Sequence, residues 1–188
     1  PDALFHRWRV GHWQWPLGAI ITGLLVAAVL DIREPWYAGV AASALGIVSK
    51  RAFRTRWTNL LNPAAFGLVC VTYLFDSALS WRGAMPGIVP VAAWPLLAAS
   101  GIYVVHRVRR WPLVVAFFAA YFALFSVATF VLDPEDVAEV FVAPDLHAVV
   151  FFAVFMLPAP PTSPAPERAQ AVAGVIVATL SVAAFLTA

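Results

Sequence analysis

Residues 149–157, VVFFAVFML, form an apolar run that is followed at once by PAPPTSP at residues 158–164. Proline lacks a backbone N–H and breaks a helix interior, so four prolines in seven residues cannot continue the preceding segment as helix. Unwound polar backbone beside a helix at membrane depth is costly unless protein or a water-filled cavity covers it. This proline break, residues 158–164, is therefore a candidate functional site as well as a connection between helices.

The composition is that of an integral membrane protein. Hydrophobic residues make up 62% of the 188 residues and charged residues 12%, whereas soluble domains have about 25% charged residues. The length suits one compact helical bundle, so residues 1–188 are expected to form a single membrane domain. A net charge of +2 without a basic stripe argues against nucleic acid as a partner. Cys70 is the single cysteine, which excludes an intrachain disulfide.

Seven apolar segments predict an all-α, polytopic membrane helix bundle with about six or seven transmembrane segments, two of them broken or half helices. A helix needs about 20 residues to cross roughly 30 Å of hydrocarbon. The fourth, fifth and seventh segments meet that length, the first and third meet it with flanking residues, and the second and sixth are short. Residues 1–16, where tryptophan stands beside arginine, are expected to lie at the membrane interface. The segments are residues 17–30, 36–49, 60–75, 87–105, 112–132, 146–157 and 169–187.

The basic residues predict the orientation of these segments. If all seven cross the bilayer, ten of the twelve lysines and arginines fall on one side, and only Arg33 and Arg82 fall on the other. The positive-inside rule places the side with more lysines and arginines, which includes the N-terminus, in the cytoplasm. The expected location is the inner membrane of a bacterium. The C-terminus is then outside if residues 146–157 cross, and inside if they are re-entrant. The ten residues are Arg7, Arg9, Lys50, Arg51, Arg54, Arg56, Arg107, Arg109, Arg110 and Arg168.

A second break opens the third apolar segment at Asn62 and Pro63. Asparagine is a good N-cap and proline suits the first helical position, so one interpretation is a capped helix start. The other is a ligand site near the bilayer midplane, because short or proline-interrupted segments in corresponding halves of a chain point to one. Thr162 and Ser163 leave a similar choice. Their hydroxyls either satisfy backbone groups freed by the prolines or bind a ligand.

Motifs that are collinear over residues 49–165 carry a family resemblance. They are SKR at 49–51, LNPAAFGL at 61–68, GIY at 101–103 leading to the arginines of 107–110, and ML at 156–157 followed by PPTSP at 160–164. Together they resemble the NqrB/RnfD family, membrane subunits of the sodium-pumping NADH:quinone oxidoreductase and of the Rnf electron-transport complex. The resemblance implies inverted repeats in which the asparagine–proline and proline–threonine–serine–proline motifs occupy corresponding places.

The resemblance also implies a flavin, either FMN esterified to a threonine or non-covalent riboflavin. The attachment motif, serine or threonine followed by Gly-Ala-Thr or Gly-Ala-Ser, is absent, and the nearest stretch, RGAM at 82–85, offers no hydroxyl. The family's Thr-Asp pair is replaced by Pro158 and Ala159. We therefore expect a short, divergent member with non-covalent flavin (FMN or riboflavin) and without covalent FMN. The residues expected to line its site are Asn62, Pro63, Phe66, Gly67, Thr162 and Ser163.

Histidines offer one other cofactor site. A bis-histidine haem needs two imidazoles that face one cavity, and the pair expected near the same membrane face is His12 and His106. No HExxH, Walker loop or Rossmann fingerprint occurs, so no further metal or nucleotide site is expected from motifs.

The leading hypothesis is a membrane electron-transfer subunit. It would hold a flavin or quinone non-covalently in a pocket between the two breaks, or support a redox partner, and whether it is itself an oxidoreductase is open. One alternative is a channel or transporter for a small polar solute on the same broken-helix fold. Another is a structural membrane subunit of a larger complex. Expected partners are the lipid bilayer, a redox protein or other membrane subunits, and a second copy of the chain in a homo-oligomer.

Overall fold

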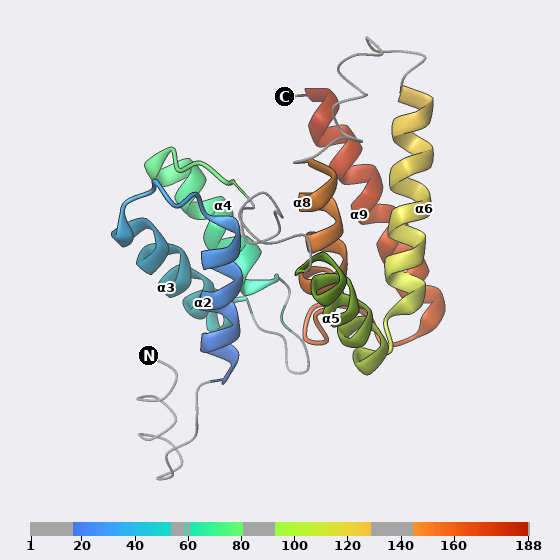
Figure 1. Cartoon of the computed structure of the whole chain (residues 1–188), viewed down its shortest axis with the longest axis horizontal. Coiled ribbons are helices and arrows are strands. Elements are labelled where there is room, and N and C mark those ends of the chain that lie inside the picture. Colours follow the sequence, from blue (N-terminus) through green and yellow to red (C-terminus); the bar gives the residue numbers. More distant parts are fainter. Residues whose placement is uncertain (1–16, 54–58, 60, 81–92, 129–144, 188) are drawn as a thin grey trace. The chain divides into compact units, whose positions relative to one another are not determined.

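A computed structural model describes residues 17–53, 59, 61–80, 93–128 and 145–187 (Figure 1). Regular secondary structure in these ranges is helical, without a β-strand. The prediction of an all-α chain is therefore confirmed for the described part, and the crossing of a membrane stays a prediction. The helices are α2 (Leu17–Val29), α3 (Trp36–Ala52), α4 (Pro63–Phe75), α5 (Ala93–Val108), α6 (Trp111–Ala128), α8 (Asp145–Phe151) with the π-helical η2 (Phe152–Met156), and α9 (Glu167–Thr187).

Each predicted apolar segment overlaps one of these helices, and the sixth overlaps both α8 and η2. Helix α3 continues to Ala52, beyond the predicted end at residue 49, so the second segment is longer than the sequence indicated. Helix α5 is described from Ala93 to Val108, past the predicted end at residue 105, and residues 87–92 lie outside the described part. The sixth segment is α8 followed directly by η2, so it is a short helix that ends before the proline break.

The chain divides into two compact units. Unit 1 comprises Pro1–Ala84 and contains α2, α3 and α4; unit 2 comprises Met85–Ala188 and contains α5, α6, α8, η2 and α9. The prediction of one membrane domain stays a prediction.

Unit 1 is built on a close crossing of α3 and α4. A Cβ atom added to Gly67 of α4 would overlap the carbonyl oxygen of Ala42 on α3, and one added to Gly46 of α3 would overlap the carbonyl oxygen of Pro63. Ala42 and Gly46 are four residues apart, as are Pro63 and Gly67, so small residues line one face of each helix at this crossing. Such small-residue spacing is how helices approach closely where backbones must touch.

One end of unit 1 is closed by hydrogen bonds between the α2–α3 turn and the segment after α4. Asp31 N donates to Ala78 O at 3.1 Å, Ser80 N donates to Val29 O at 3.0 Å, and the Glu34 carboxylate accepts from Ala78 N at 2.8 Å. These bonds bring the end of α2, the start of α3 and the end of α4 to one place. The three helices therefore alternate in direction, as successive crossings of a bilayer would require.

Unit 2 is built around the contact between α6 and α9, which lie side by side (Figure 1). A Cβ added to Gly174 of α9 would overlap the carbonyl oxygen of Leu113 on α6, so the two backbones nearly touch there. Beyond this point Phe117, Tyr121 and Phe125 of α6 form a buried cluster with Ala153 of η2 and with Ala178 and Val182 of α9.

The π-helical segment η2 packs on α5 as well as on α6. Its Val154 lies against Gly101 of α5, where an added Cβ would come within 2.8 Å of the valine Cγ2 atom. The wider π turn ends at Met156, two residues before the buried Pro158 of the proline break. The short sixth segment therefore ends in an irregular turn just before the break that the sequence indicated. π-Helical turns are rare and are frequently found at functional sites.

Two helices of the described part are long and apolar enough to cross a membrane, α6 with 18 residues and α9 with 20 residues over Glu167–Leu186. In the most apolar 18 residues of each helix, only 33% of α6 and 22% of α9 is buried, whereas the core helix of a soluble protein is mostly buried. Their outward faces are apolar; Val115 of α6 and Ile176 and Leu180 of α9 are examples. Helices α2 and α4 are apolar but shorter, with 13 residues each.

Candidate functional site

Asn62 caps the start of α4 at the first break. Its side-chain Oδ1 accepts hydrogen bonds from the backbone N–H groups of Ala64 at 3.0 Å and Ala65 at 3.3 Å. Its carbonyl accepts from Phe66 N at 2.9 Å, and Pro63 opens the helix. These are the bonds of an N-cap followed by a proline at the first helical position. Of the two interpretations of this break, the structure shows the capped helix start, and a ligand there stays a prediction.

The other three candidates of this break lie in the first two turns of α4. Gly67 is buried against Ala42, and the carbonyl of Pro63 faces Gly46 across the same crossing. Phe66 is half-buried, with its ring centroid 5.5 Å from that of Phe53, just beyond α3. The contacts described for these residues hold α3 and α4 together, and their role in lining a cofactor site stays a prediction.

Replacing Asn62 by alanine is expected to destabilise the protein by about 1 kcal/mol, because two N–H groups of α4 lose their acceptor. Asn62→Ser, which supplies another oxygen at the cap, should restore most of that free energy. The free energy of unfolding of the detergent-solubilised chain, followed by circular dichroism, measures both variants. Equal losses for alanine and serine would show that the cap is not what Asn62 contributes.

The proline break of unit 2 folds back on its own backbone. The N–H groups of Thr162 and Ser163 both donate to Ala159 O at 3.0 Å, and the Thr162 hydroxyl donates to the same carbonyl at 3.2 Å. Thr162 therefore satisfies local backbone, which was one of the two roles considered for it. Ser163 is different, because its buried hydroxyl oxygen accepts a hydrogen bond from another element.

That donor is Arg110, whose Nε lies 2.8 Å from the Ser163 hydroxyl. Arg110 follows the end of α5, where Arg109 adopts a left-handed conformation with φ 56°. Arg109 N donates to His106 O and Arg110 N donates to Val105 O, which is the bonding pattern of a Schellman motif. This turn fixes Arg110 between α5 and α6, so the arginine joins the turn to the proline break.

Gln170, in the first turns of α9, is the most buried polar side chain near this break, with 1% of its surface exposed. Its Nε2 donates to Ala165 O at 2.8 Å, which fixes the direction of the amide. Its Oε1 is buried and has no hydrogen-bond partner in the described part of the chain. A buried acceptor of this kind costs free energy unless water or a ligand supplies a donor.

Arg110 and Gln170 were not among the site residues predicted from the sequence. A signal existed for Gln170, because it is the one amide in the apolar run 169–187. No local signal links Arg110 to Ser163, which are 53 residues apart in the chain. The six predicted lining residues thus form two groups, Asn62, Pro63, Phe66 and Gly67 in unit 1 and Thr162 and Ser163 in unit 2, and a pocket joining them stays a prediction.

The predicted haem pair, His12 and His106, lies only partly within the described residues and stays a prediction. His106 is exposed in the last turn of α5, and His12 lies outside the part that the structure describes. Across the described ranges, no group of three or more histidine, cysteine, aspartate or glutamate side chains is placed to hold a metal ion.

In the part of the chain that the structure describes, the regular structure is helical, two apolar helices are long enough to span a membrane, and an arginine holds the proline break. No protein-family model matches the chain. It is 30% identical over 88 residues to a subunit of the Na(+)-translocating NADH-quinone reductase of Chlamydia pneumoniae. The matched stretch covers 45% of this chain and 18% of that relative, so the chain spans less than a fifth of the relative's length. This partial similarity supports the resemblance to the NqrB-like subunits and does not extend to the whole relative.

Proposed function

We propose that this chain is a membrane subunit of an electron-transfer complex. The observation that carries the proposal is the similarity to a subunit of a Na(+)-translocating NADH-quinone reductase. The apolar, weakly buried helices α6 and α9 support a membrane location, since a helix in lipid has no need to bury its outward face. Other membrane subunits of such a complex, or a redox protein, are then its partners.

The finer proposal is that the chain holds a flavin or a quinone without a covalent bond. A bound flavin supplies the electron transfer, and the protein supplies its position and its hydrogen bonds. The polar groups at the proline break fit such a molecule, because Gln170 Oε1 is a buried acceptor that lacks a donor in the described part of the chain. The imide N–H of a flavin is a suitable donor to Gln170 Oε1. The Ser163 hydroxyl, seven residues earlier in the chain, is a further polar group that the flavin could contact.

The asparagine break favours a second function, that of a structural membrane subunit. The Asn62 side chain accepts two backbone N–H groups, and the Thr162 hydroxyl bonds to its own loop. Polar groups engaged in this way maintain the fold whether or not a cofactor is present. A subunit with this role would assemble with redox partners and carry no flavin.

The visible absorption spectrum of the detergent-purified chain separates these functions. The flavin proposal predicts a yellow protein whose flavin is released by denaturation. Gln170→Leu should lower the affinity for flavin at least about tenfold, which corresponds to the loss of one buried hydrogen bond. Ser181→Ala is the matched control on α9, because in the described part of the chain that hydroxyl bonds within its own helix, to Val177 O. A folded, colourless protein would contradict the flavin proposal and favour the structural subunit, whereas a Soret band would indicate haem. Recovery of the chain with membranes after alkaline washing tests the membrane location independently.

A further inference from the structure

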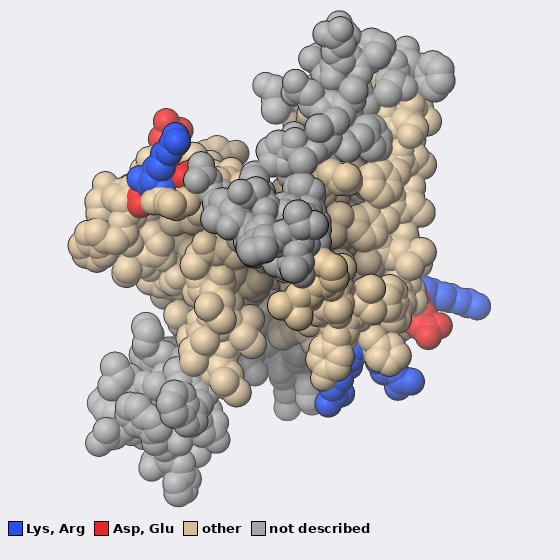
Figure 2. Space-filling model, viewed as in Figure 1, with Lys and Arg blue, Asp and Glu red and all other residues tan. Residues whose placement is uncertain are grey.

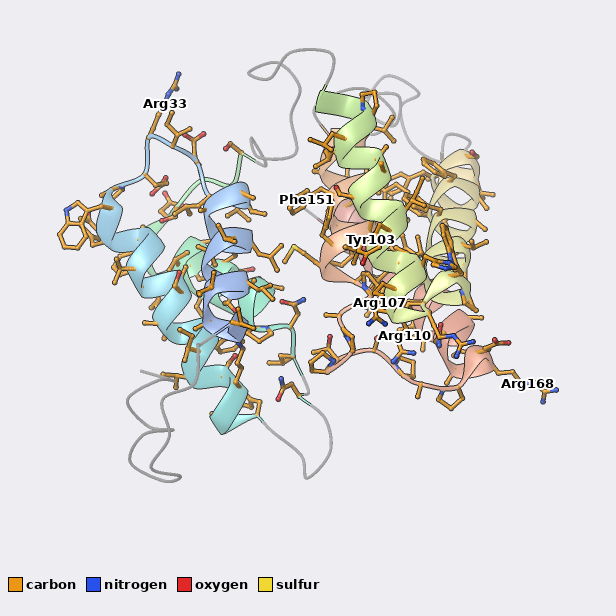
Figure 3. All side chains as sticks on the ribbon, turned by 60° about the horizontal axis from the view of Figure 1, so that its bottom comes forward. Arg33, Tyr103, Arg107, Arg110, Phe151 and Arg168 are labelled. Atoms are coloured by element: carbon orange, nitrogen blue, oxygen red, sulfur yellow. The ribbon has the colours of Figure 1, made fainter. Side chains whose placement is uncertain are left out.

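The described arginines of unit 2 gather at one end (Figure 2). They are Arg107 in the last turn of α5, Arg109 and Arg110 in the turn before α6, and Arg168 in the first turn of α9. Glu167 is the acid described at this end, so the arginines exceed it by three charges. Figure 3 shows Arg107 and Arg110 beside the proline break and Arg168 at the start of α9. We call Arg107, Arg109, Arg110 and Arg168 the arginine end.

The arginine end coincides with the ends of the two described helices that are long enough to cross a membrane. Helix α6 begins at Trp111, directly after Arg110, and α9 begins one residue before Arg168. Trp111 is 40% exposed, and tryptophan beside arginine is typical of the headgroup level of a bilayer. If α6 and α9 cross the membrane as proposed above, the four arginines lie where lipid phosphates lie.

Arg110 differs from the other three because Ser163 holds it. The bond from its Nε leaves both terminal nitrogens of the guanidinium without a partner among the described residues. Arg107, Arg109 and Arg168 are exposed and make no side-chain hydrogen bond or ion pair in the described ranges. A guanidinium that is fixed through its Nε and has unpaired terminal N–H groups can donate two hydrogen bonds to the oxygens of a phosphate group.

We propose that the arginine end binds the phosphate headgroup of an anionic phospholipid, with Arg110, positioned by Ser163, at its centre. The proposal rests on the membrane location given above and does not depend on a flavin. Charge complementarity selects the lipid, since an excess of arginines at the level of the headgroups attracts a net negative headgroup more strongly than a zwitterionic one.

The test titrates the full chain in detergent micelles with dioleoyl phosphatidylglycerol or dioleoyl phosphatidylcholine, and counts bound lipid by native mass spectrometry. We expect preferential binding of phosphatidylglycerol. Each of Arg107→Gln, Arg110→Gln and Arg168→Gln should lower its affinity about fivefold, the worth of one basic residue near an anionic surface. Arg33→Gln is the matched control, because Arg33 is an arginine at the α2–α3 turn of unit 1 and should leave the affinity unchanged.

The Ser163 contact is tested by a second pair of variants. As a single change, Ser163→Ala should weaken phosphatidylglycerol binding. Added to Arg110→Gln, it should have no further effect. Thr162→Ala, which removes the neighbouring hydroxyl that bonds to Ala159 O, should leave binding unchanged. Circular dichroism identifies any variant that fails to fold, and the exposed Arg107 and Arg168 keep the test valid if Arg110 variants unfold.

Three results would overturn the proposal. One is equal binding of the two lipids, and another is an equal loss on Arg33→Gln. The third is displacement of phosphatidylglycerol by inorganic phosphate at matched phosphate concentration, which would assign the site to a soluble anion. A colourless protein that still prefers phosphatidylglycerol would contradict the flavin proposal and support the lipid site. Recovery of the chain in the aqueous fraction after alkaline washing would instead contradict the membrane location.

Discussion

Gly67→Ala is expected to destabilise the protein by about 3 kcal/mol, although it adds a single methyl group. The added Cβ would overlap the carbonyl oxygen of Ala42 and lie 2.9 Å from its carbonyl carbon and 3.3 Å from the nitrogen of Gly46. All three are backbone atoms of α3, so the clash cannot be relieved by a side-chain rotation. The whole of α3 must move away from α4, with loss of the contacts along their crossing.

Gly23→Ala is the matched control for that variant. A Cβ at Gly23 of α2 would meet nothing closer than Ser43 Oγ at 4.0 Å, an ordinary contact distance. Alanine in a helix interior is favoured over glycine by about 0.5–1 kcal/mol, so this variant should be neutral or more stable. Denaturant unfolding of the two variants in detergent, followed by circular dichroism, gives the comparison. Similar unfolding free energies for both would mean that α3 and α4 do not cross at Gly67.

The Gly67 variant also bears on the prediction that this residue lines a cofactor site. Gly67 was predicted from the sequence to be a lining residue, and its position against Ala42 gives a separate reason for a glycine there. The expected loss of stability does not depend on flavin. It should therefore be the same in protein that has been stripped of any cofactor, whereas a loss confined to the flavin-bound protein would support the lining role.

The segments with a local physical cause were predictable from the sequence. Apolar runs of sufficient length indicated the positions of the helices, and Asn62 followed by Pro63 indicated the start of α4 because both residues act within one helical turn. The proline break was equally predictable, since a proline cluster excludes helix whatever surrounds it. These features depend on neighbours within about four residues.

The contacts between elements were less accessible. The bond between Arg110 and Ser163 joins residues 53 positions apart and depends on a left-handed residue, Arg109, that is not glycine. Nothing in a helical period marks such a turn. The α3–α4 crossing did leave a signal, because Ala38, Ala42 and Gly46 recur every four residues, the spacing of small residues on one helix face. Predictions from apolar length and charge alone do not use that spacing.

The same distinction applies to the candidate site. Motif order identified the two breaks, but each break turned out to be bonded largely within its own unit, Asn62 to α4 and Thr162 to its loop. Beside the proline break, Gln170 Oε1 and the terminal nitrogens of Arg110 have no partner in the described part of the chain. Ser77 Oγ and Ser80 Oγ in unit 1 are also buried without a partner there. A ligand at the proline break could bond both to a buried acceptor and to a held guanidinium.

The second large effect is expected in unit 2, where Phe117→Ala should cost about 3 kcal/mol of unfolding free energy. Phe117 is 1% exposed, and its ring lies 5.5 Å from that of Tyr121 and 5.8 Å from that of Phe152. Removal of the ring leaves a cavity where α6, η2 and α9 meet. The loss persists in lipid or detergent, because it comes from dispersion contacts that the cavity walls no longer make.

Val115→Ala provides the control on the same helix, since Val115 is 59% exposed and its removal opens no cavity. It should change the unfolding free energy by no more than about 0.5 kcal/mol. The two variants together test which face of α6 is packed against protein. If α6 turned its Val115 face inward in the assembled complex, the control would lose stability only when the partner subunits are present. A loss at Val115 in the isolated chain, with none at Phe117, would contradict the orientation of α6 in this structure.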